Sequence, residues 1–319
     1  MSAFLILVIS FISLVWAANH LITGALGLAT RFQLSPFIIG LTIVAFGTSV
    51  PELIIFTLSY LENKNHLIIG NAIGSNIANI SLILGISILI KPLTINYNAL
   101  KKTYPIIIIT MLFAYSLTLD GVLGIIDGYL FLFACIALII LFIYLSNRNN
   151  PKNQFINEFK SAINCNRSLK MHILSMFLGL FVLPLSTKYL IQSATELANL
   201  AGMTPLTIGL TIIAIGATLP GLATAVIAVL KGEEDLATGT ILGTNIYSLL
   251  LILALPPIIN PSKIGSSLLW REMPVMVSLT VLLIFLNYQY KKKLGLWHGG
   301  ILLIVYCSYI ISLIIRALD

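Results

Sequence analysis

One short stretch of the chain places a carboxylic acid, two hydroxyls, a glycine and a proline inside an apolar segment. The run over residues 45–52 reads AFGTSVPE, and its surroundings are apolar from Pro36 to Leu61. A segment of that length can cross a bilayer as a helix. A carboxylate at membrane depth costs about 2.5 kcal/mol or more on insertion scales, so it usually marks an ion path. Gly47 and Pro51 favour a break that frees backbone carbonyls. The stretch predicts a discontinuous transmembrane helix with a cation site at its break.

A second polar stretch follows in the next apolar segment. Residues 70–79 read GNAIGSNIAN, so Asn71, Ser75 and Asn79 stand four residues apart and share one face of a helix. Carboxylate, hydroxyl and amide oxygens suit hard cations such as Na⁺ and Ca²⁺. Small polar residues alone would also serve close helix packing. Because a carboxylate lies in the first stretch, we expect a cation site.

The composition is that of a polytopic membrane protein. The 319 residues are 58% hydrophobic and 9% charged, and the mean hydropathy is +1.02. These values indicate a membrane protein and not a soluble protein with a large core. The net charge of +7 does not indicate nucleic-acid binding, because the basic residues fall in short loops. The three cysteines lack the spacing of a metal cluster or a disulfide framework. The apolar segments predict an all-α fold of ten transmembrane helices, over residues 3–29, 34–61, 66–90, 104–119, 124–146, 171–199, 203–230, 235–259, 272–288 and 297–317.

The two halves of the chain resemble each other. A shift of 169 residues lays positions 36–85 on positions 205–254 and gives 19 identities in 50 without a gap. Unrelated apolar segments would share leucine and isoleucine, but here the shared residues include Gly40/Gly209, Gly47/Gly216, Pro51/Pro220, Gly70/Gly239, Gly74/Gly243 and Asn76/Asn245. Each half holds five predicted helices, an odd number, so the second half must be inverted in the membrane. Inverted repeats place a substrate site near the midplane, where the halves meet.

The basic residues predict the orientation of the chain. With the N-terminus outside, 13 Lys and Arg residues fall on the cytoplasmic side and 4 on the opposite side. We therefore expect both termini to be extracytoplasmic in an integral protein of the plasma (inner) membrane. The predicted organisation is a first five-helix repeat over residues 1–146, a cytoplasmic linker over 147–170 and a second five-helix repeat over 171–319.

The motifs GTSVPE at residues 47–52 and GNAIGSNIAN at residues 70–79 closely resemble the first alpha-repeat of the sodium/calcium exchangers. These belong to the calcium/cation antiporter superfamily, whose prokaryotic members look most similar. The resemblance covers both halves of the chain. It implies a monomeric antiporter of two inverted five-helix repeats, with Na⁺, and Ca²⁺ or H⁺, as transported ions. The first and sixth helices would slide past a core formed by the others.

The resemblance also implies a ligand set when it is carried over by position. It comprises the carbonyls of Ala45 and Ala214 and the side chains of Thr48, Ser49, Glu52, Asn71, Ser75, Asn79, Thr218, Thr244 and Ser248. Among these, Glu52, Asn79 and Thr48 are the expected metal ligands for Na⁺ or Ca²⁺.

The second repeat departs from the family at the site itself. Residues 216–221 read GATLPG where the family has Thr, Ser and a second Glu around the proline. The position in the second repeat that is equivalent to Glu52 is therefore occupied by Gly221. Two carboxylates can balance one Ca²⁺, but Glu52 alone leaves a net positive charge, which is worth several kcal/mol at an effective dielectric constant of about 20. The expected function is a cation antiporter. The alternatives are a monovalent-cation or cation/H⁺ exchanger, or a transport-impaired relic.

Other classes of membrane protein fit the sequence less well. An intramembrane enzyme would need a nucleophile with a base or two facing aspartates, and no predicted helix contains a His–Glu pair or a GxGD stretch. A channel could use broken helices, but an inverted repeat in a single chain favours an occluded site. We therefore expect no catalytic residue and no cofactor. The acidic run over residues 233–235 falls in a loop, where we expect a solvated helix end.

Overall fold

The computed structural model describes residues 2–32, 34–50, 52–53, 65–94, 97–148, 168–203, 214–289 and 293–318. In the first half the elements are α1 (Ser2–Phe32), α2 (Pro36–Ile39), η1 (Gly40–Val44), α4 (Asn65–Ala78), η2 (Asn79–Ile83), α5 (Leu84–Ile90), β1 (Leu93–Thr94), α6 (Tyr97–Thr118), β2 (Val122–Leu123) and α7 (Ile125–Arg148). In the second half they are α9 (Leu169–Leu200), α11 (Ala214–Leu230), α12 (Glu234–Tyr247), η4 (Ser248–Ile252), α13 (Leu255–Ile259), β3 (Ser262–Lys263), η5 (Leu268–Glu272), α14 (Met273–Gln289), β4 (Lys293–Leu294) and α15 (Leu296–Leu318). Nearly all of the predicted linker lies outside the described residues.

The fold is a helical bundle with the composition of a membrane protein. Within the described residues, seven helices are long and apolar enough to cross a membrane, and three shorter apolar helices cover Pro36–Val50, Thr103–Thr118 and Ile215–Leu230. Each of them coincides with one predicted segment. Large apolar side chains cover the outside, as on α7, where Phe133 is 73% exposed, and on α9, where Phe181 is 76% exposed. Such a surface is matched to lipid and not to water.

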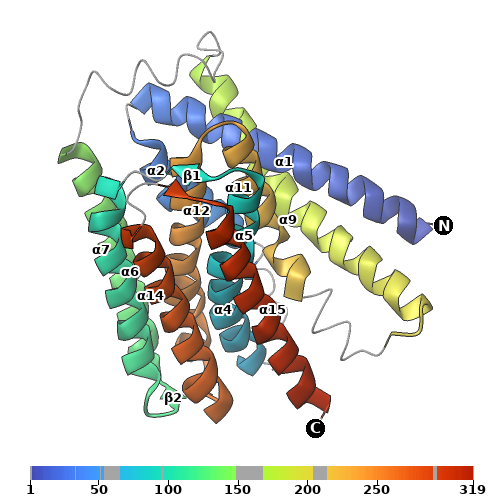
Figure 1. The fold of residues 1–319 in the computed structure, drawn as a ribbon, viewed down its shortest axis with the longest axis vertical. Helices are drawn as coiled ribbons and strands as arrows, with labels where there is room; N and C mark the ends of the chain where they lie inside the picture. The colour runs from blue at the N-terminus through green and yellow to red at the C-terminus, as the bar shows by residue number, and fades with distance from the viewer. Residues whose placement is uncertain are drawn as a thin grey trace.

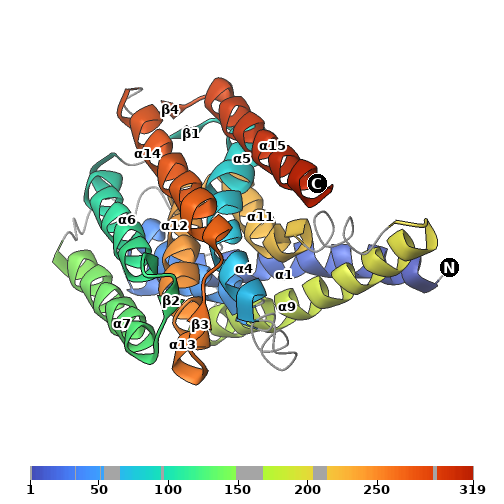
Figure 2. The same ribbon diagram turned by 90° about the horizontal axis from the view of Figure 1, so that it is seen from below.

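Two helical segments form the centre of the bundle. The segment Ile69–Ile90 is 72% buried and the segment Glu234–Ile259 is 83% buried, whereas the other long helices are buried over 22% to 39% of their most apolar stretch. Both views show α4 and α12 surrounded by the remaining helices (Figures 1 and 2). These two segments carry most of the polar motifs singled out in the sequence, so the motifs lie in the interior.

The two longest helices, α1 and α9, lie side by side along one flank (Figure 1). They run antiparallel, because Leu21 contacts Gly179 while Gly27 contacts His172. A Cβ added at Gly179 would lie 2.5 Å from the Leu21 nitrogen, so glycine permits this close approach. At 31 and 32 residues each helix is roughly 46–48 Å long at 1.5 Å per residue, which exceeds the hydrocarbon core of a bilayer. The pair must therefore tilt or extend beyond it.

Short antiparallel strand pairs connect the two halves of the chain at two places. In one pair β1 joins β4, with Leu93 opposite Leu294. In the other β2 joins β3, with Val122 opposite Lys263. The sequence analysis did not predict these strands. They connect the ends of helices across the bundle and leave it essentially all-α.

The predicted helix break is not present where the structure can be described. Residues 45–50 and 52–53 are helical, and Pro51 itself lies outside the described residues. In the second half, α11 continues through Pro220, because a spanning helix can tolerate proline when its neighbours satisfy the freed backbone groups. In the described part of the chain the irregular turns lie elsewhere, in the π-helical segments η1, η2, η4 and η5. Segments η2 and η4 begin at Asn79 and Ser248, so the helices widen at candidate ligands, as π turns often do at functional sites.

Candidate cation site

The backbone of α2 and η1 packs directly on α12. A Cβ added at Gly239 would lie 2.2 Å from the Phe37 carbonyl oxygen, and one added at Gly243 would lie 2.3 Å from the Leu41 carbonyl oxygen. Glycines at these positions let two backbones approach without an intervening side chain. This contact holds residues 45–50 and 52–53 against the end of α12, so the polar residues of the two halves face each other.

Glu52 lies at the junction of the two halves. Its side chain is only 5% exposed, and one carboxylate oxygen accepts a hydrogen bond from the Ser248 hydroxyl at 2.5 Å. The Ser75 hydroxyl lies beside this carboxylate and donates its hydrogen bond to the Ala72 carbonyl oxygen at 3.1 Å. Among the described residues the salt bridges involve Glu234 and Glu272 but not Glu52. The buried carboxylate is thus held by the neutral Ser248 hydroxyl, and its negative charge remains available to a cation.

A second contact between the halves lies one helical turn from Glu52. The Thr48 and Thr244 hydroxyl oxygens are 2.9 Å apart. The hydroxyls of Thr48 and Ser49 also reach the Ala45 carbonyl oxygen, each at 3.0 Å. All three hydroxyl-bearing side chains are at most 4% exposed. Four of the predicted ligands therefore form one buried group of oxygen atoms.

Asn79, the first residue of η2, forms a further contact between the two halves of the chain. Its Nδ2 donates a hydrogen bond to the Asn245 Oδ1 at 2.8 Å. Its Oδ1 lies 3.8 Å from the position that a Cβ on Gly221 would occupy, and the Ile83 Cδ1 lies 3.0 Å from the same position. A side chain at position 221, where the family has a second carboxylate, would therefore meet the Asn79 amide oxygen and the Ile83 methyl group.

The remaining predicted ligands are less closely engaged. The Thr218 hydroxyl donates to the Ile215 carbonyl in its own helix at 2.8 Å. Asn71 is half-buried in α4, and Ala214 is the first residue of α11. Among the described residues no hydrogen bond joins Asn71 or Thr218 to Glu52, so the place of these residues in the ligand set stays a prediction.

Sequence reasoning missed two features of the interior. Asn245 was noted as a residue common to both halves but not as a contact of a ligand. Glu272, 5% exposed, pairs with Arg271 and accepts a hydrogen bond from the Tyr309 hydroxyl. A glutamate inside an apolar segment was the signal that could have revealed this second buried carboxylate.

Within the acidic run at the start of α12, Glu234 differs from its prediction. Glu234 is buried, at 9% exposure, and its carboxylate forms a salt bridge with Lys91 at 3.0 Å. It is therefore not a solvated helix end. The salt bridge connects α12 to the end of α5, outside the group of residues around Glu52.

The described residues contain no group of three or more His, Cys, Asp and Glu side chains that could hold a metal ion. A site here must therefore rely on hydroxyl, amide and carbonyl oxygens around one carboxylate, which are ligands suited to hard cations.

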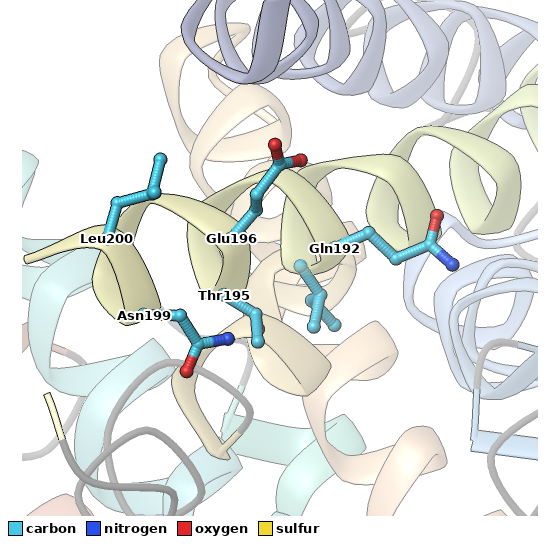
Figure 3. Close-up of a pocket in the computed structure, with 6 residues that line it drawn as sticks. Gln192, Thr195, Glu196, Asn199 and Leu200 are labelled. Carbon is cyan, nitrogen blue, oxygen red and sulfur yellow. The ribbon is translucent and has the colours of Figure 1, made fainter. Parts of the chain in front are cut away.

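A separate surface hollow of about 520 Å³ lies along the second half of α9. Its described lining comes from this helix alone and consists of Ile191, Gln192, Thr195, Glu196, Asn199 and Leu200. Figure 3 shows Glu196 and Asn199 on opposite sides of the helix. The hollow includes none of the predicted ligands, so the candidate site is the buried group around Glu52.

A buried group of oxygen ligands inside a bundle of apolar spanning helices is typical of integral membrane transport proteins. Comparison with known proteins identifies the family. The family model for sodium/calcium exchanger protein matches residues 2–146 and 171–315. The chain belongs to the sodium/calcium exchanger family.

Individual relatives agree over nearly the whole chain. A candidate antiporter, CaxA of Alkalimonas amylolytica, is 34% identical and is matched over 96% of this chain and 97% of its own length. The sodium/calcium exchanger MaX1 of Methanosarcina acetivorans is 27% identical over 97% and 98% of the two chains. A structure of the sodium-calcium exchanger NCX_Mj superposes with a TM-score of 0.83 at 26% identity and covers 98% of this chain and 99% of that chain. The relatives and the fold are those of transporters and not of enzymes.

Proposed function

We propose that the protein is a secondary active cation antiporter that works by alternating access, with a midplane cation site centred on Glu52. The observation that carries this proposal is the buried Glu52 carboxylate, which accepts its hydrogen bond from Ser248 in the other half of the chain. A buried carboxylate in a membrane is costly and usually lies on an ion path. The ligands would be the predicted set from Ala45 to Ser248, with Glu52, Thr48 and Asn79 closest to the ion.

We further propose that the chain forms ten spans in two inverted repeats, over residues 1–146 and 171–319. Equivalent contacts at an offset of 169 support this: Glu52 pairs with Ser248, and Gly221 faces Asn79. The Thr280 hydroxyl, at the position equivalent to Met111, donates to the Met111 sulfur. The family model also matches one stretch in each half. Such repeats place a site near the midplane where they meet.

In this proposal the protein acts as a monomer in the plasma (inner) membrane with both termini outside. Membrane lipid and inorganic cations are its only partners. The α1 and α9 pair would slide along the rest of the bundle and open the site to one side at a time. The transported ions are Na⁺ together with Ca²⁺ or H⁺.

One observation favours the alternative of a monovalent-cation or cation/H⁺ exchanger, or of a transport-impaired relic. Gly221 supplies no side chain, and Ile83 lies against the space where a second carboxylate would project. A doubly charged ion would then keep one uncompensated charge in a medium of low dielectric constant.

The proposal is tested by Na⁺-driven ⁴⁵Ca²⁺ uptake into proteoliposomes that contain wild type, Glu52→Ala or Gly221→Glu. Uptake by wild type that Glu52→Ala abolishes would establish a sodium/calcium exchanger with a single carboxylate. Uptake only by Gly221→Glu would identify a retained scaffold with a retuned site. Exchange of Na⁺ or H⁺ without Ca²⁺ would establish the alternative, and the absence of every cation flux would contradict antiport.

A further inference from the structure

We propose that Asn245 is a positioning residue that sets the ion specificity of the site. By holding the Asn79 amide, it turns the amide oxygen toward Gly221 and creates an uncharged half-site that accepts a monovalent cation. This inference rests on the proposed function.

The hydrogen bond between the two asparagines fixes the direction of the Asn79 amide. The Asn79 Nδ2 donates to the Asn245 Oδ1 at 2.8 Å, and the two side chains are 3% and 0% exposed. The nitrogen and the oxygen of an amide point to different sides, so holding the nitrogen determines where the oxygen points. The Asn79 Oδ1 lies 3.8 Å from the Cβ position of Gly221. It therefore faces the space that the missing carboxylate leaves.

The charge of the site follows from this arrangement. On the Glu52 side, a carboxylate accepts a hydrogen bond from the Ser248 hydroxyl. On the Gly221 side, an amide oxygen and the Ile83 methyl group border the space. An amide oxygen is a suitable ligand for a hard cation but carries no net charge. One negative charge among neutral oxygens balances a monovalent ion and leaves a divalent ion uncompensated.

The unpaired atoms of the asparagines point to the same role. The Asn245 Nδ2 and the Asn76 Oδ1 have no hydrogen-bond partner among the described residues, and leaving a buried polar atom without a partner destabilises the fold. The hydrogen bond that Asn245 forms with η2 therefore uses its oxygen, which accepts from Asn79. Asn76, the repeat equivalent of Asn245, donates only to the Ala72 carbonyl in its own helix. It is therefore a matched control.

The test is the Na⁺ dependence of ²²Na⁺ exchange by the full chain in proteoliposomes. Asn245→Leu should raise the KM for Na⁺ about tenfold, which corresponds to about 1.4 kcal/mol, with the maximal rate changed by less than about twofold. A carboxylate still accepts the Asn79 hydrogen bond, so Asn245→Asp should not raise the KM. The matched control Asn76→Leu should leave the KM unchanged. Equimolar Ca²⁺ should inhibit wild type only weakly.

A double-mutant cycle separates a positioning role from a general packing role. If Asn245 acts through Asn79, then adding Asn245→Leu to Asn79→Ala should not raise the KM further. Additive effects, an equal rise in Asn76→Leu, or strong inhibition of wild type by Ca²⁺ would overturn the inference. If Asn245→Leu does not fold, Asn245→Ser, whose hydroxyl is too short to hold the amide, replaces it in the same comparison. If Asn245→Leu and Asn245→Ser exchange Na⁺ as wild type does, only this inference is overturned. If wild type itself shows no saturable Na⁺ exchange, the proposed function is overturned as well.

Discussion

At the scale of single residues, the site consists of one charge and the neutral groups that surround it. The Ser248 hydroxyl donates to the Glu52 carboxylate at 2.5 Å, and the Ser75 hydroxyl, which donates to the Ala72 carbonyl, lies beside it. A hydrogen bond to a charged group contributes about 1.5–3 kcal/mol. The Ser248 hydroxyl therefore stabilises a carboxylate that would otherwise be buried alone, and both hydroxyl oxygens can rotate to contact an ion.

We predict that Ser248→Ala weakens Na⁺ binding at least about tenfold, because the loss of one hydrogen bond to a charged group is worth about 1.5–3 kcal/mol. Saturation of ²²Na⁺ exchange in proteoliposomes measures this effect. Ser87→Ala is the matched control, because Ser87 is also fully buried but its hydroxyl donates only to the Ile83 carbonyl. An equal loss in both variants would assign the effect to packing and not to the site.

The sequence predicted the residues that are costly in a membrane but not their partners. Glu52 and the substitution at Gly221 stand out because a carboxylate or its absence is visible at a known repeat position. The bond between Asn79 and Asn245 depends on how α4 packs against α12, which spacing along one helix does not determine. Ser248 was placed in the ligand set by resemblance, and its direct bond to Glu52 emerges only from the tertiary structure.

At the scale of secondary-structure elements, the site depends on close backbone contacts. The Leu41 carbonyl oxygen would lie 2.3 Å from a Cβ at Gly243, and the next residue, Thr244, forms the contact with Thr48. A larger residue at this position must push the two helices apart. Separation of the helices would pull the hydroxyl pair apart as well.

We predict that Gly243→Ala lowers the unfolding free energy by about 1–3 kcal/mol, the usual cost of overpacking, and also reduces exchange. Thermal unfolding of the purified protein in detergent provides the stability measurement. Gly300→Ala is the control, since a Cβ at Gly300 would meet no described atom within 4 Å and alanine favours a helix. Unchanged stability of Gly243→Ala would contradict the tight contact.

The positions of the helices were predictable because apolar length alone identifies a span. Their irregularities were not predictable. Proline and glycine suggested a break near Pro51, yet α11 continues through the equivalent Pro220 and widened turns begin at Gly40, Asn79 and Ser248. A π turn arises from packing around one extra residue per turn, and the sequence carries no strong local signal for it.

At the scale of the whole molecule, the proposed mechanism requires two layers that move relative to each other. The long α1 and α9 pair lies along one side of the bundle (Figure 2), and the Lys231 side chain bonds to Thr23 of α1 at 2.5 Å. The central segments with α4 and α12 hold the site. A site in the fixed part and a sliding pair of helices are what alternating access requires, because the ion must face only one side at a time.

The most direct test of a single alternating cation site at Glu52 is ²²Na⁺ efflux from loaded proteoliposomes, measured with and without Na⁺ outside. A single alternating site returns more readily when it is occupied. Alternating access at Glu52 therefore predicts that external Na⁺ accelerates efflux strongly in wild type and has no effect in Glu52→Gln, which removes the charge but keeps the shape. Efflux that is equally fast without an external cation would indicate a channel. Equal acceleration in Glu52→Gln would place the ion site away from Glu52, and either result would contradict the account.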